Sequence, residues 1–146
     1  MPTLRSPKAD GTASRTSTAT IARLVPTVLD NRLRHFAAVK DAAGCRATAE
    51  KWEALHRTDA ESLYALAAAR AVTAAVIRAT DKFDTAADQA NAEADRAMTW
   101  LRKAIAAGYA DAENVAKDAD LNALRDREDF MKLLAGLTAK RQDGKK

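Results

Sequence analysis

The chain has 146 residues, enough for one domain with a hydrophobic core but too few for an enzyme domain beside a separate binding module. Alanine accounts for 36 residues, against only five glycines and three prolines, and β-branched residues do not alternate with polar ones, so an all-α fold is predicted. Residues 1–24 and 140–146 each carry a net charge of +3, which leaves −2 for the residues between them and argues against nucleic-acid binding by the core.

Three regions follow from composition along the chain. Residues 1–20 hold two prolines, a glycine and many hydroxyl side chains, so they cannot bury enough apolar surface to offset the entropy of ordering. We predict a disordered basic tail over 1–20, a helical domain over 21–139 and a second disordered basic tail over 140–146.

The first two helices of this domain are predicted from apolar residues at three- and four-residue steps. The first covers about 26–43, and we expect Gly44 to end it because glycine tolerates a left-handed conformation. The second covers about 45–56 and is too short to be stable without neighbours. Its inward face carries Cys45, Ala49 and Trp52.

A longer pair of helices is predicted next. Thr58 and Glu61 form a capping-box pattern that starts the third helix, a turn follows at Asp81–Asp84, and Gly108 ends the fourth helix. Small side chains along the fourth helix favour close approach of a neighbour. The predicted inward residues are Leu63, Leu66, Ala67, Ala71, Ala74 and Ile77 on the third helix, and Ala87, Ala90, Ala94, Ala97, Met98, Leu101, Ala104 and Ile105 on the fourth.

Shorter helical pieces are predicted over 111–117 and 119–125, followed by a last helix over 127–139. We expect Asp118 or Asp120 to cap the short helix, and Asp126 to cap the last one. The inward residues of the last helix are Phe130, Leu133, Leu134 and Leu137.

Helix pairs joined by short turns indicate a repeat architecture. Ala97-x3-Leu101-x2-Ala104 resembles the small-large-small seam of a tetratricopeptide helix, and Cys45-x3-Ala49-x2-Trp52 resembles it more loosely. The sequence separation between Ala67 and Ala97 is longer than a standard repeat allows. Arg70 occupies a position where the repeat usually has an aromatic residue. The resemblance implies antiparallel helix hairpins stacked as a degenerate tetratricopeptide-like superhelix.

The end of the domain carries a more specific pattern. Ala107-Gly108-Tyr109 precedes Asp118-x-Asp120-Leu121-x2-Leu124-Arg125-x-Arg127-x-Asp129-Phe130 and Leu133-Leu134. This resembles the segment that closes tetratricopeptide-like regions at the C-terminal end of bacterial eukaryotic-type Ser/Thr protein kinases and related multidomain proteins. The resemblance implies an accessory, protein-binding region with a fold-closing motif, and the kinase phosphate loop, catalytic base and magnesium ligands are missing from the sequence.

The same segment has an alternative interpretation as a calcium loop, because five oxygen-bearing side chains occupy EF-hand positions 1, 3, 5, 9 and 12. The glycine required at position 6 is replaced by Ala123, and Arg125 and Arg127 would place two cations beside the ion. We therefore expect the segment to close the fold and bind no metal. The five side chains are Asp118, Asp120, Asn122, Asp126 and Asp129.

The function predicted from these patterns is a non-catalytic module that binds a protein or peptide, without cofactor, in the cytoplasm and away from membranes. Tyr64, Arg70 and Tyr109 are the candidate partner-binding residues, and the two tyrosines could lie at the rim of a concave repeat surface. The alternative is a small hydrolase or transferase that uses Cys45 with a histidine. The isolated positions of both histidines, His35 and His56, argue against that alternative.

Overall fold

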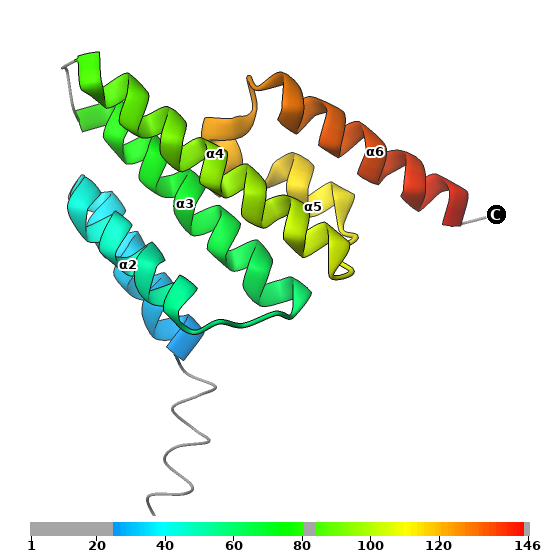
Figure 1. The fold of residues 1–146 in the computed structure, drawn as a ribbon, viewed down its shortest axis with the longest axis horizontal. Coiled ribbons are helices and arrows are strands. Elements are labelled where there is room, and N and C mark those ends of the chain that lie inside the picture. The colour runs from blue at the N-terminus through cyan, green and yellow to red at the C-terminus, as the bar shows by residue number, and fades with distance from the viewer. Residues whose placement is uncertain (1–24, 81–83, 145–146) are drawn as a thin grey trace, which may run out of the picture.

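The computed structural model describes residues 25–80 and 84–144. No strand occurs within them, so the all-α prediction is confirmed. The tail predicted over 1–20 and turn residues 81–83 lie outside the described residues. The elements are a helix over residues 25–38, called the N-terminal helix below, then α2 (Ala42–Ala54), α3 (Ala60–Thr80), α4 (Asp84–Ala106), α5 (Ala112–Lys117), the 3₁₀ helix η2 (Ala119–Leu124) and α6 (Glu128–Gly144), as Figure 1 shows.

Helix α3 is the centre of the fold. It runs antiparallel to α4 and also packs against α2 and η2 (Figure 1). Leu63 and Ala67 belong to the apolar cluster shared with α4 and the closing segment, whereas Leu66 and Val72 belong to the cluster shared with α2 and the N-terminal helix. Because α3 is buried on both sides, it is apolar almost all round. By length and composition alone it could also cross a membrane, but most of that stretch is buried inside the bundle.

Alanines fill the interface between α3 and α4. All of the inward residues predicted for the third helix are buried, and so are most of those predicted for the fourth. Ala87 is the exception, because it is exposed and Ala86 takes the buried position, while Ile105 is half-buried. The alanines with no exposed surface at this interface are Ala67, Ala71, Ala74, Ala90, Ala94, Ala97 and Ala104.

Two glycines that were both predicted to end helices have different roles. Gly108 does end α4: its φ is +116°, its N–H donates to the carbonyl of Ile105, and the N–H of Tyr109 donates to the carbonyl of Ala104. This is the Schellman arrangement. Gly44 does not end a helix. It lies in the first turn of α2, where its N–H donates to the carboxylate of Asp41 at 3.0 Å.

The N-terminal helix ends instead before Lys40, which has a φ of +58°. Gly44 serves a packing purpose, because a Cβ atom built there would lie 2.3 Å from the ring of Phe36. The turn therefore lies where it was predicted, but the predicted role of Gly44 was wrong.

The cap of α3 also differs from the predicted capping box. The N–H of Ser62 donates to Oδ2 of Asp59 at 3.0 Å, so Asp59 rather than Thr58 caps this helix. The hydrogen bond from Ser62 lowers the pKa of the Asp59 carboxyl. A carboxylate is the favoured group at the positive end of a helix.

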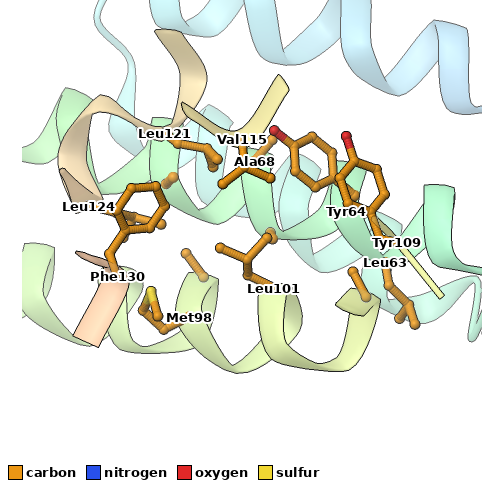
Figure 2. Close-up of a cluster of buried hydrophobic side chains, with 14 of the residues drawn as sticks. Leu63, Tyr64, Ala68, Met98, Leu101, Tyr109, Val115, Leu121, Leu124 and Phe130 are labelled. Atoms are coloured by element: carbon orange, nitrogen blue, oxygen red, sulfur yellow. The ribbon is translucent and has the colours of Figure 1, made fainter. Parts of the chain in front are cut away.

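The closing segment of α5, η2 and α6 covers the open side of the α3–α4 pair. Figure 2 shows Leu121, Leu124 and Phe130 packed together with Met98 and Leu101 of α4, and all five are buried. The prediction that these residues of the motif dock inward is confirmed. Leu134 is half-buried, and Leu137 is buried one turn later.

Helix α6 extends further than predicted, through Gly144 instead of ending at 139. Lys140, Arg141 and Gln142 are all good helix formers, which accounts for the continuation.

Candidate functional site

A pocket of about 350 Å³ lies between the N-terminal helix, α3 and the segment that joins α5 to η2. We call it the acidic pocket, because it combines an apolar lining with three carboxylates. Elements far apart in the sequence form it, so it exists only in the folded chain. Its lining residues are Pro26, Thr27, Asp30 and Leu33 of the N-terminal helix, Trp52 of α2, Tyr64, Ala65 and Ala68 of α3, and Asp118 and Asp120.

One guanidinium neutralises part of this charge. Arg34 donates to both carboxylate oxygens of Asp120, which is 86 residues away in the sequence, and it also pairs with Asp30 at 3.2 Å. The hydrogen bond to Asp120 raises the pKa of the Arg34 guanidinium above its usual range. Among the residues that the structure describes, no lysine, arginine or histidine lines the pocket itself. Within the described residues, three carboxylates line the pocket and Arg34 pairs with two of them, so the lining keeps an excess of negative charge and a negative potential.

The third carboxylate, Asp118, holds two elements together. Its Oδ1 accepts the N–H of Asp120 at 2.9 Å, which caps η2, and its Oδ2 accepts the hydroxyl of Tyr64 at 2.6 Å. Of the two residues predicted to cap this short helix, Asp118 therefore does so. Burial, and then the hydrogen bond to Asp118, raise the pKa of the Tyr64 hydroxyl.

Tyr64 and Tyr109 form one stacked pair, with ring centroids 4.2 Å apart and planes 4° from parallel. Figure 2 shows the two rings side by side with both hydroxyl groups pointing the same way. The hydroxyl of Tyr109 accepts a hydrogen bond from Nδ2 of Asn114 at 2.7 Å. Both rings are buried, so they do not form an exposed rim. Tyr64 still contributes to the wall of the acidic pocket, whereas Tyr109 lines a hollow beside α6.

Arg70 lies in the interior, which corrects the expectation that it contacts a partner. Its side chain is 1% exposed. Nε and Nη2 donate to Oε1 of Glu53 at 3.0 and 2.8 Å, and Nη1 donates to Oε2 of Glu93 at 2.9 Å. Trp100 donates its indole N–H to Glu53, and Arg46 pairs with Glu93 at 3.2 Å. The five side chains tie α2, α3 and α4 together.

The two arginines of the closing motif, Arg125 and Arg127, bind groups within the motif, and Arg127 also links it to α4. Arg125 donates to the carbonyl of Asp118 at 2.6 Å and to the side chain of Asn122 at 2.8 Å. Arg127 pairs with Asp129 at 3.0 Å and with Asp95 of α4 at 2.7 Å. The hydrogen bond from Arg127 lowers the pKa of Asp129.

The acidic side chains of the motif have separate partners instead of converging on one point. Asp118 bonds Tyr64, Asp120 bonds Arg34, and Asp129 accepts the N–H of Phe130 at 2.9 Å as well as Arg127. Asp126, which we expected to cap α6, is exposed. Within residues 25–80 and 84–144, no group of three or more His, Cys, Asp or Glu side chains could hold a metal ion.

Cys45 does not have the surroundings of a catalytic nucleophile. The thiol has no exposed surface, and burial, followed by the nearby charge of Asp41, raises its pKa to about 11. His35 and His56 are both exposed, and His35 packs edge-on against Phe36 with ring centroids 5.4 Å apart.

The sequence-based candidates did not include Asp30, Arg34, Glu53 or Glu93. The sequence held a signal for Glu53 and Glu93. Arg70 falls on an apolar helix face, and a buried arginine requires a carboxylate partner. No comparable signal marks Asp30 and Arg34, because an exposed aspartate and arginine one turn apart are common on helix surfaces.

Comparison with known proteins adds no relative, because no family model, no curated protein and no solved structure matches the chain.

Proposed function

We propose that the chain is a non-catalytic helical module that binds a segment of another protein in the acidic pocket. The observation that carries this proposal is the pocket itself, where apolar side chains and three carboxylates from separate elements meet. Binding sites commonly combine an apolar lining with a few polar groups that orient the ligand. The partner segment that suits this chemistry presents a lysine or arginine side chain with an apolar neighbour.

A tetratricopeptide-like superhelix is the finer architecture we propose. In it the N-terminal helix pairs with α2, α3 pairs with α4, and α5 with η2 pairs with α6. The first members of these pairs supply most of the pocket lining, which supports the proposal because repeat proteins bind partners on an extended concave surface. The link to kinase accessory regions, a bacterial source and a cytoplasmic location belong to the same proposal. Kinase motifs in the reading frame upstream would support that link.

The alternative, a hydrolase or transferase dependent on Cys45, receives no support from the geometry. A catalytic cysteine needs an accessible thiol with a lowered pKa and a base within hydrogen-bond reach. Cys45 is fully buried, and its pKa is raised.

Selection of peptides from a random library on the full chain tests the proposal, with Ala65→Leu as the variant that fills the pocket. Ala65 is half-buried on the pocket wall, and leucine is a good helix former. Ala87→Leu is the matched control, because Ala87 is exposed on α4 outside the pocket lining. We expect peptides rich in lysine or arginine that bind the wild type and the control but not Ala65→Leu. Peptides that bind all three proteins equally, or no enrichment at all, would contradict the proposal.

A further inference from the structure

A second hollow lies between the end of α4 and α6. Two pockets of about 220 and 240 Å³ share Ile105, Leu137 and Lys140 and thus adjoin one another. We call the joined hollow the α6 furrow. Its lining residues are Arg102, Ile105, Gly108, Tyr109, Ala110, Lys132, Leu133, Gly136, Leu137 and Lys140.

The furrow is open at Gly136, in the middle of α6. A Cβ atom built at Gly136 meets nothing within 4 Å, so the missing side chain leaves space that a ligand can enter. From Lys132 to Lys140 the furrow follows α6 for about 12 Å, roughly two helical turns. Figure 1 shows the C-terminal part of α6 extending beyond the rest of the bundle.

The charge of the furrow is opposite to that of the acidic pocket. Arg102, Lys132 and Lys140 line it, and among the residues whose side chains the structure describes no carboxylate does. Arg102 pairs with Asp129 at 3.6 Å, and Lys132 pairs with Glu128 at 3.3 Å. Both cations are more than half exposed, so these pairs are weak and exchange readily for a ligand carboxylate.

We propose that the α6 furrow binds an acidic amphipathic helix of a partner protein. Ile105 and Leu133, both half-buried, offer an apolar surface for aliphatic side chains on one helix face, and the buried Leu137 lines the same hollow. The three cations flank that surface for aspartate or glutamate side chains. Helix-in-groove recognition uses this division between apolar anchors and flanking charges. The inference does not depend on the acidic pocket, which suits a segment of the opposite charge.

Fluorescence anisotropy with a labelled synthetic helix tests this inference on the full chain. The probe has about 14 residues, with leucine along one face and glutamate elsewhere, and the comparison peptide carries lysine in place of glutamate. We expect the acidic peptide to bind at least about tenfold more tightly than the basic one, and to weaken as salt screens the exposed cations. Equal binding of the two peptides would overturn the proposal.

Substitutions at one position separate binding from folding. Gly136→Leu fills the furrow, whereas Gly136→Ala adds only a methyl group, and both replace a helical glycine with a better helix former. We expect Gly136→Leu to bind the acidic peptide about tenfold or more weakly than Gly136→Ala does, with no loss of thermal stability in either variant. Equal affinities of the two variants would show that the peptide binds elsewhere.

Charge reversal supplies the second control. Lys140→Glu removes a furrow cation, and Lys51→Glu makes the same change at an exposed residue of α2 outside the furrow. We expect only Lys140→Glu to reduce the affinity for the acidic peptide, by several-fold. Equal effects would indicate nonspecific attraction and overturn the proposal. Binding to anionic phosphatidylglycerol vesicles without binding to the peptide would assign the furrow to a membrane and would also overturn it.

Discussion

Replacement of Arg70 by methionine tests whether the buried ion pairs hold the three central helices together. The change removes three hydrogen bonds, two to Glu53 and one to Glu93. Loss of one partner from a buried pair typically costs about 3–5 kcal/mol, because the other charge stays buried without compensation. Glu53 keeps the indole N–H of Trp100, and Glu93 keeps Arg46. We therefore expect the lower end, about 3 kcal/mol of unfolding free energy.

The matched control is Arg78→Met, the same substitution on the same helix. Arg78 is exposed and donates to the carbonyl of Ala123 and to Oδ1 of Asn91, each at 3.0 Å. Loss of the Arg78 side chain should lower the free energy of unfolding by about 1 kcal/mol. Urea unfolding followed by far-UV circular dichroism measures both variants.

A double variant then separates charge burial from packing. Arg70→Met combined with Glu93→Gln leaves a neutral amide at a position that is 4% exposed, so part of the lost stability should return. The reasoning fails if Arg70→Met costs no more than Arg78→Met, or if the double variant is less stable than Arg70→Met alone.

Three further predictions concern the closing motif, Gly44 in the first turn of α2, and the thiol of Cys45. Phe130→Ala should cost about 3–5 kcal/mol and Asp120→Ala, which breaks a partly exposed ion pair, about 1 kcal/mol in thermal unfolding. Calcium should not alter the melting temperature of the wild type; a gain that Asp120→Ala abolishes would restore the calcium-loop interpretation. Gly44→Ala should destabilise the chain by about 1–3 kcal/mol in urea, because the new methyl group would overlap the ring of Phe36, and an unchanged midpoint would refute this account. Cys45 should react with a thiol reagent at pH 8 only as fast as the chain unfolds. Since its pKa is raised to about 11 in the fold, this thiol should lower stability as pH rises from about 9 to about 11, a fall that Cys45→Ala would remove.

The features that could be predicted from the sequence are those that depend on neighbours within a few residues. The four-residue apolar steps of α3 and α4, and the glycine that ends α4, are local signals, and the structure confirms them. Leu121, Leu124 and Phe130 were also assigned correctly to the core, since apolar side chains at helical spacing have little alternative but burial.

Local signals failed where one residue type serves two purposes. Gly44 could equally supply a left-handed turn or make room for a ring from the preceding helix, and only the position of Phe36 distinguishes these roles. Tyr64 was assigned to a rim for a similar reason. An aromatic residue with a hydroxyl suits an exposed edge or a buried site with one acceptor, and Asp118 supplies that acceptor.

The acidic pocket itself was decided by the tertiary structure. Arg34 and Asp120 meet across 86 residues, and Tyr64 and Asp118 across 54, because α3 packs between the N-terminal helix and the closing segment. Helical periodicity determines which face of each helix is apolar, but it does not determine which charged side chains at the edges of two such faces become neighbours. That choice depends on how the faces are turned and offset against each other, and it is made when alanine-lined surfaces pack closely in three dimensions.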